Sequence, residues 1–388
     1  MPLSAIAPSP PRLPSLDGWR ALSIILVLGM HCVFTQGFPP EFRAAFGWLF
    51  DGNLGVRIFF CISGFLITHL LLGEHAKTGR IRLREFYLRR ALRILPVFFA
   101  FLAVVAWLDW RTPLAITPGQ WLRHLTFTTG LGSSPQITNH LWSLSAEEQF
   151  YVLWPALIVL GGLTRSPKKA LTVLAVPLLI SPLMRAVGYF EWLPLNWRWI
   201  VGRFSPPLYC DSIALGCGLA IIWPTITTRG RRWLCERPFW TVVVGLTLVA
   251  VPHVFSQLKL AQVVMAPLGH TLQGLGIILL LAQSILLPKW GLYRLLNLAP
   301  VMLLGVLSYS VYLWQQMFWI SPKTFGMASV WWMSFPVWLV PPLVLGAASY
   351  YALERPLLSL RARYRCGAKP RSLSTQKNAS AEKCERNS

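Results

Sequence analysis

The sequence predicts an all-α protein that crosses a membrane about ten times as a bundle of helices, with both termini in the cytoplasm. Of its 388 residues, 54% are apolar and only 13% are charged. An ordinary soluble domain carries roughly 25% charged residues, so this composition argues against a soluble fold. The apolar residues also come in runs that recur about every 30 to 40 residues, each long enough to span a bilayer as a helix. One polytopic membrane domain accounts for nearly the whole chain.

Ten predicted spans follow from stretches of about 20 mostly apolar residues, the length a helix needs to cross the hydrocarbon core. This transmembrane domain, residues 16–360, follows a proline-rich cytoplasmic segment, 1–15, without an apolar stretch of its own, so we expect the first span to remain as a signal anchor. Residues 361–388 are polar and basic and predict a disordered cytoplasmic tail. The predicted spans are 20–36, 54–73, 91–109, 141–162, 170–188, 206–225, 239–255, 263–287, 299–320 and 331–353.

The formal net charge of +22 would suit a nucleic-acid partner, but its distribution indicates a membrane instead. Of the 36 Lys and Arg residues, 27 fall in the termini and alternate loops that ten spans leave on one side. This is the positive-inside pattern of a multi-pass protein of the bacterial inner (plasma) membrane. Basic segments beside helices also attract anionic lipid head groups. Membrane lipids, and no nucleic acid, are therefore the predicted partners of these charges.

The seven cysteines are scattered along the chain, with no CxxC pair and no spacing typical of zinc ligands. We interpret them as free thiols and predict no metal site. They are Cys32, Cys61, Cys210, Cys217, Cys235, Cys366 and Cys384.

Arg20 and His31 are the titratable residues of the first span, within LDGWRALSIILVLGMH. A charged side chain inside a membrane costs about 2.5 to 3.5 kcal/mol on insertion scales, so each one suggests a function. Eleven residues make about three helical turns, which places Arg20 and His31 on one face, roughly 16 Å apart along the axis. The alternative is an imidazole held only by a hydrogen bond from a neighbouring helix.

Glu147 and Glu148 lie about two turns inside the fourth span, in NHLWSLSAEEQFYVLWP. Glu147 falls at a depth similar to that of His31, so the two would meet if their helices pack together. A carboxylate beside an imidazole fixes its tautomer and raises its basicity, as a general base requires. Alternatively, the two acids complement the helix macrodipole and face the interface, which fits Glu148 better because the two side chains point about 100° apart.

Two further features lie in the middle of the membrane and at its cytoplasmic side. Ser63 and Gly64, in FFCISGFLIT, are mid-membrane in the second span, where small residues usually indicate close helix packing. Arg89, Arg90 and Arg93, in EFYLRRALRILP, have the three- and four-residue spacings that let side chains converge on one anion, such as the polyphosphate of coenzyme A. Lipid anchoring is the alternative for such arginines.

Taken together, these segments resemble the acyltransferase-3 family of bacterial integral-membrane O-acyltransferases, whose features occur here in order across almost the whole chain. The resemblance implies a ten-helix bundle that transfers an acyl group from cytoplasmic acyl-coenzyme A, by default acetyl-coenzyme A, to a hydroxyl of a carbohydrate such as a cell-surface or lipid-linked polysaccharide. It also implies a bare transmembrane module, without the fused esterase-like domain of some members. The features are the Arg20-to-His31 spacing, GVRIFFCISGF at 55–65, FYLRRALRILP at 86–96, WSLSAEEQFY at 142–151, SYSVYLW at 308–314 and ERP at 354–356.

Motif matching assigns roles to individual residues. His31 would be the catalytic base and Glu147 its partner. One departure is that Gln315 and Gln316 follow SYSVYLW where the family commonly has a His; since an amide cannot titrate, a proton relay at this position is in doubt. The implied donor-binding residues are Arg20, Arg89, Arg90 and Arg93, and the auxiliary residues are Ser63, Tyr309 and Glu354.

A proton-coupled transporter or flippase of a polysaccharide or lipid precursor is the main alternative, because its spans would also carry intramembrane His and Glu. Against it, the two halves show no internal repeat and the arginine cluster lies on a loop. A structural partner in a polysaccharide-export complex is a second alternative. Product formation that depends on acyl-coenzyme A would separate the enzyme from both. Loops 109–140 and 188–205, rich in Trp and Pro, are candidate acceptor contacts, although most of these tryptophans fit an interfacial belt.

Overall fold

The computed structural model describes residues 13–193 and 206–358, which fold into a helical bundle. These ranges contain no β-strand beyond an isolated bridge between Gln36 and Ser334, so the predicted all-α class is confirmed. Most of the predicted N-terminal segment, the tail 361–388 and much of loop 188–205 lie outside the described residues. The helices are α1 (Leu16–Cys32), α2 (Arg43–Leu49), α3 (Gly52–Thr78), α4 (Leu83–Arg111), α5 (Pro118–Leu125), α6 (Leu141–Leu160), α7 (Pro167–Tyr189), α8 (Cys210–Thr225), α9 (Arg231–Glu236), α10 (Pro238–Gln257), α11 (Gln262–Leu286), α12 (Tyr293–Leu296), α13 (Ala299–Trp319) and α14 (Val340–Ser349), which a π-helical turn, η11 (Tyr350–Glu354), extends.

A helix lies at each of the ten predicted spans, and within the described ranges eight helical segments are long and apolar enough to cross a membrane. The chain is therefore a multi-pass membrane protein. The two spans outside those eight are α1, which has 17 residues, and α6, which carries the paired acids. The number of spans and the side on which the termini lie remain predictions.

The tenth span begins later than predicted. Residues 331–339 form two short 3₁₀ turns, and the α-helix starts only at Val340. Proline explains this difference, because Pro336 lacks the N–H that a continuous helix would need there. Pro341 and Pro342 stand instead in the first turn of α14, where proline is well tolerated.

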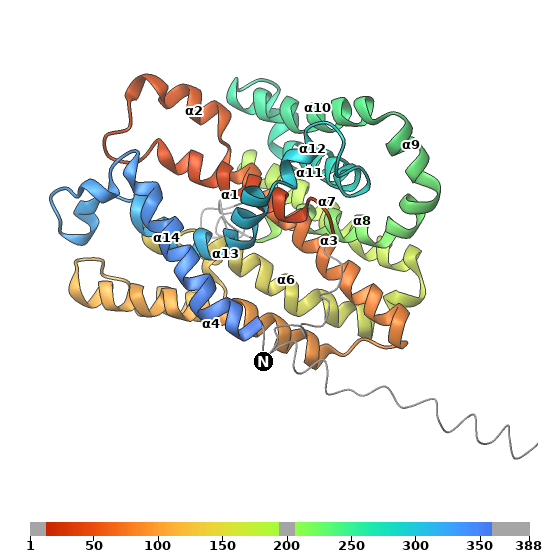
Figure 1. Ribbon diagram of the computed structural model, residues 1–388, viewed down its shortest axis with the longest axis horizontal. Helices are drawn as coiled ribbons and strands as arrows, with labels where there is room; N and C mark the ends of the chain where they lie inside the picture. The colour runs from red at the N-terminus through yellow and green to blue at the C-terminus, as the bar shows by residue number, and fades with distance from the viewer. Residues whose placement is uncertain (1–12, 194–205, 359–388) are drawn as a thin grey trace, which may run out of the picture.

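The central helix α1 packs between α3 and α13, and these three helices organise the bundle (Figure 1). On one side, α13 packs against α14, and η11 lies along α4. On the other side, α3 packs along α8, which contacts α7 and α11, and α10 covers α11. Large apolar side chains project outward, for example Leu160 and Leu179, which are 84% and 71% exposed, as a lipid-facing surface requires.

Glycines allow α3 and α8 to approach at backbone distance. A Cβ on Gly64 would overlap the carbonyl oxygen of Ile213, and a Cβ on Gly216 would overlap that of Cys61. The close packing that small residues predicted at Ser63 and Gly64 is therefore confirmed for Gly64.

A buried ion pair ties α7, α8 and α11 together. Arg185 Nη2 lies 2.8 Å from Asp211 Oδ2, and its other nitrogens donate to the carbonyl oxygens of Leu208 (2.6 Å) and Pro267 (2.8 Å). Thr271 also contacts this pair. All guanidinium nitrogens of Arg185 are thus hydrogen-bonded, which suits a structural role for this intramembrane charge.

Candidate active site

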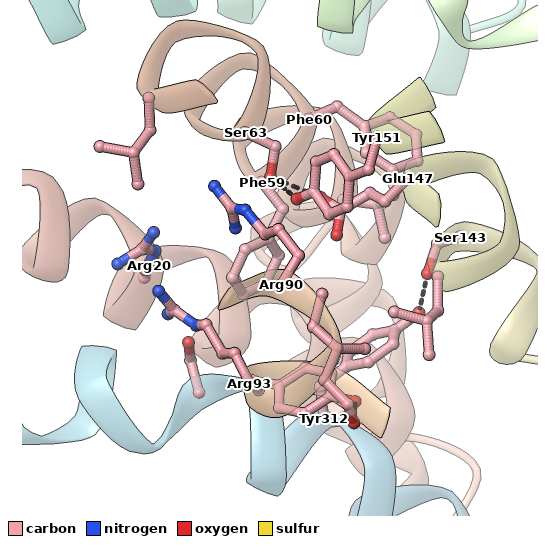
Figure 2. A pocket seen from close by; sticks show the side chains of 16 residues that line it. Arg20, Phe59, Phe60, Ser63, Arg90, Arg93, Ser143, Glu147, Tyr151 and Tyr312 are labelled. Carbon is pink, nitrogen blue, oxygen red and sulfur yellow. Dashed lines mark hydrogen bonds between the residues drawn. The ribbon is translucent and has the colours of Figure 1, made fainter. Parts of the chain in front are cut away.

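A polar cavity lies where α1, α3, α4, α6 and α13 meet (Figure 2). The space between its atoms, including the solvent at its open mouth, is about 790 Å³. We call it the arginine cavity, after the three arginines in its wall. Its polar lining residues are Arg20, Ser63, Arg90, Arg93, Ser143, Glu147, Tyr151, Ser308, Tyr309 and Tyr312.

The guanidinium groups of Arg20, Arg90 and Arg93 gather on one side of this cavity (Figure 2). Arg90 and Arg93 share a face of α4 because three residues make nearly one turn, and Arg20 approaches from α1. Arg20 is bonded to Asp17 (3.1 Å), whereas Arg90 lies 4.9 Å over the ring of Tyr151. Within the described ranges neither Arg90 nor Arg93 forms an ion pair, so the cavity presents positive charge to a ligand.

Arg89 does not join this cluster, and the expected convergence of all three α4 arginines is wrong in this respect. Its guanidinium lies 3.3 Å from Glu74 Oε2 and 3.7 Å from Glu85 Oε2. On a helix Arg89 and Arg90 point about 100° apart. Arg89 therefore links the ends of α3 and α4 outside the cavity.

Glu147 is hydrogen-bonded to Ser63 and not to His31. The Ser63 hydroxyl donates to Glu147 Oε1 (2.6 Å), and the Tyr151 hydroxyl donates to Ser63 Oγ (3.0 Å) (Figure 2). The expected contact between Glu147 and His31 is absent from the described structure. Glu147 instead faces the arginine cavity, where positive charge offsets the cost of burying its carboxylate.

His31 is buried at the end of α1, 8% exposed, and is held by two residues of α13. Its Nδ1 lies 2.8 Å from Gln315 Oε1. Its ring stacks on that of Trp319, with centroids 4.4 Å apart and planes inclined by 11°. The sequence predicted that a carboxylate oxygen of Glu147 would be the hydrogen-bond partner of the imidazole. In the structure this partner is the amide oxygen of Gln315.

The hydrogen bonds of Gln316 determine which nitrogen of His31 carries the proton. Gln316 Nε2 faces the backbone oxygen of Gln136 (2.6 Å), which can only accept, and Gln316 Oε1 faces the indole N–H of Trp319 (3.2 Å), which can only donate. Since Oε1 is an acceptor, the group of Gln315 that faces it (3.2 Å) is the NH₂. Gln315 therefore turns its oxygen toward His31, Nδ1 carries the hydrogen, and Nε2 keeps a lone pair that can accept a proton.

Tyr312 lines the arginine cavity one helical turn before Gln315, the hydrogen-bond partner of His31. The hydroxyls of Tyr312 and Ser143 are hydrogen-bonded to each other (2.6 Å) (Figure 2). Tyr312 and Gln315 are three residues apart, about 4.5 Å along the axis of α13. A single stripe of α13 thus carries part of the cavity wall and then the hydrogen-bond partner of His31.

The remaining predicted residues lie around this arrangement. Tyr309 lines the cavity, and its hydroxyl donates to the carbonyl oxygen of Ile94 (2.8 Å). Glu354, in η11, accepts from Ser310 outside the cavity, so it ties η11 to α13. Glu148 is half-buried, and its Oε1 is inaccessible and has no hydrogen-bond partner in the described ranges.

Residues 13–353 match the model of a family that is described as an acyltransferase domain. The chain belongs to this acyltransferase family. The family resemblance seen in the sequence is thereby confirmed, across nearly the whole chain. No solved structure matches it.

Among curated proteins, the chain is similar to O-acetyltransferase OatA of Staphylococcus aureus, with 28% identity over 79% of this chain and 50% of that protein. It is also similar to peptidoglycan O-acetyltransferase OatA of Listeria monocytogenes, with 25% identity over 78% of this chain and 48% of that protein. The chain spans about half the length of these relatives.

Sequence reasoning missed several residues of the site, among them Tyr151, Tyr312 and Trp319. Tyr151 stands four residues after Glu147, a spacing that places both side chains on one face of α6, so its place in the cavity wall could have been predicted. Tyr312 and Trp319 gave no such signal, because aromatic residues on an apolar helix usually belong to its packing. Gln315 had been noticed only as a departure from the family's usual His.

Proposed function

We propose that this chain is a membrane O-acyltransferase that moves an acyl group, acetyl by default, from cytoplasmic acyl-coenzyme A to a hydroxyl of a carbohydrate acceptor at the bacterial inner membrane. Family membership and the O-acetyltransferase relatives support the reaction class. The observation that carries the donor assignment is the arginine cavity itself. Arginine suits phosphate because its planar guanidinium can donate two parallel hydrogen bonds.

The donor's phosphates would lie against Arg20, Arg90 and Arg93, and its pantetheine arm would run along the cavity toward Tyr312. Arg20 and His31 are about 16 Å apart along α1, so an extended arm would bring the thioester near His31. The hydroxyls of Ser143 and Tyr312, which are hydrogen-bonded to each other, would lie beside the arm on this route.

In the transfer step, Nε2 of His31 would accept the proton of the sugar hydroxyl as the hydroxyl oxygen attacks the thioester carbonyl. The new C–O ester bond forms, the C–S bond breaks, and coenzyme A leaves as its thiolate. General base catalysis of this kind typically contributes about 10²- to 10⁴-fold. The Gln315 amide would hold the imidazole in the tautomer that leaves Nε2 free.

Acetyl-labelled acetyl-coenzyme A tests this proposal in membranes that contain the wild type, His31→Ala or Arg93→Ala. With the host's surface glycans as acceptors, we expect the wild type to form an alkali-labile ester and His31→Ala to form none. Arg93→Ala should raise the KM for the donor. Wild-type transfer by a correctly inserted His31→Ala protein would refute the assigned base.

A further inference from the structure

A second cavity lies at the ends of α1 and α13 that are remote from Arg20. Its empty space is about 520 Å³, and its wall includes Phe34, Gln36, Trp319, Ser321 and Lys323. We call it the outer cavity, because the predicted topology turns this end of the bundle away from the cytoplasm. It is separate from the arginine cavity, since the two have no lining residue in common.

Trp319 connects the outer cavity with His31. It lines the cavity, and its ring stacks on the imidazole with centroids 4.4 Å apart. The ring of Phe34 lies 5.8 Å from that of Trp319 at an angle of 46°, and this Phe34 side chain is 63% exposed. A ligand in the outer cavity would therefore contact aromatic side chains, one of which stacks directly on His31, the proposed base.

The same cavity offers polar groups that other residues do not use. The backbone oxygen of Gln36 accepts a hydrogen bond from the N–H of Phe335 (2.8 Å), which holds this part of the cavity wall in place. The side chain of Gln36 has no hydrogen bond within the described ranges. Lys323 is exposed and forms no ion pair with any residue the structure describes. Aromatic faces with amide, hydroxyl and ammonium donors suit a sugar ring with polar substituents.

We propose that the outer cavity binds the acceptor glycan, with a sugar ring against Phe34 and Trp319 and a negatively charged substituent beside Lys323. This inference rests on the proposed function, because it supplies the acceptor side of the same transfer. It narrows the acceptor from any carbohydrate to an acidic glycan. It also explains how donor and acceptor reach His31 from opposite ends, through cavities that share helix α13.

Two soluble tetrasaccharides test this proposal. One is a peptide-free peptidoglycan fragment, in which every second sugar carries a carboxylate, and the other is chitotetraose, which lacks these carboxylates. Their affinities for the full chain in detergent are measured by calorimetry without any acyl donor. The wild type should bind the acidic fragment about two- to fivefold more tightly, as expected for one exposed ion pair.

Lys323→Gln should remove this preference and Lys323→Arg should keep it, whereas the control Lys259→Gln, at an exposed lysine in the loop between α10 and α11, should have no effect. Phe34→Ala should weaken both ligands by roughly three- to tenfold. Phe34 is preferred to Trp319 because the Phe34 side chain is exposed, whereas Trp319 stacks directly on His31.

Equal affinity of the wild type for both fragments, or an unchanged preference in Lys323→Gln, would overturn the charge assignment. If Phe34→Ala binds both fragments as tightly as the wild type, the proposal that the glycan binds in the outer cavity is overturned. Since binding is measured without transfer, these failures differ from a failure of the proposed function. That failure would appear as no labelled ester from a wild type that binds the glycan normally.

Discussion

Replacement of Gln315 by Leu tests whether an amide orients the proposed base. The wild-type Gln315 oxygen lies 2.8 Å from His31 Nδ1 in a buried site. Leucine is similar in size but offers no acceptor. The Nδ1 hydrogen would then be buried without a partner, which costs about 1 to 3 kcal/mol. The tautomer that leaves Nε2 free would be disfavoured by the same amount.

This cost predicts the size of the kinetic effect. Because 1.4 kcal/mol corresponds to a factor of ten, kcat should fall by about 5- to 150-fold. The KM for acyl-coenzyme A should stay near its wild-type value, since Gln315 does not line the arginine cavity. Steady-state transfer of labelled acetyl groups, with both substrates varied, measures the two constants.

Gln283→Leu is the matched control. Gln283 is also fully buried, and its amide donates to the carbonyl oxygens of Leu234 and Pro238, neither of which lines the arginine cavity or contacts His31. Its replacement should reduce stability but leave kcat per folded molecule unchanged. An unaltered kcat in Gln315→Leu, beside an inactive His31→Ala, would refute the tautomer assignment.

Three further predictions follow from particular contacts. Arg93→Ala should raise the donor KM by roughly 10- to 100-fold, which is the value of one charge-assisted hydrogen bond. Arg89→Ala should change the donor KM less than about twofold, because Arg89 lies outside the cavity. Equal effects of the two variants in kinetic assays would contradict the cavity assignment. Gly216→Ala should destabilise the bundle by about 1 to 3 kcal/mol, because its Cβ would overlap α3, whereas Gly218→Ala, with open space around it, should leave the thermal midpoint near that of the wild type. Arg185→Met should cost about 3 to 5 kcal/mol in unfolding measurements, because it leaves a carboxylate buried without its partner; a wild-type midpoint would show that the pair does not stabilise the fold.

The helices were predictable because their apolar runs are long and the bilayer sets their length. The start of the last span was misjudged because the residues 331–339 are apolar enough for a span, although proline prevents a continuous helix there. Hydropathy measures composition only. The local backbone restriction at Pro336 therefore had no weight in that prediction.

The candidate site was predictable where helical spacing decides which side chains share a face. The spacing of Arg90 and Arg93 correctly predicted a common face, and these two residues line one cavity with Arg20. Spacing could not identify partners across helices, since matching depth says nothing about which helix packs beside which. Equal depth suggested that His31 meets Glu147, but α1 packs against α3 and α13.

The physical reason for this exchange of partners is the cost of buried charge. A carboxylate beside a neutral imidazole would be buried without a cation, whereas in the arginine cavity Glu147 lies among guanidinium groups and accepts from Ser63. The amide of Gln315 fixes the same tautomer of His31 with no net charge. Charge is thus concentrated where a polyphosphate would bind, and the proposed base is held by the neutral side chains of Gln315 and Trp319. It follows that Gln315→Glu should add a buried charge remote from the arginines and should destabilise the bundle more than Gln315→Leu does, which thermal unfolding of the two variants would measure.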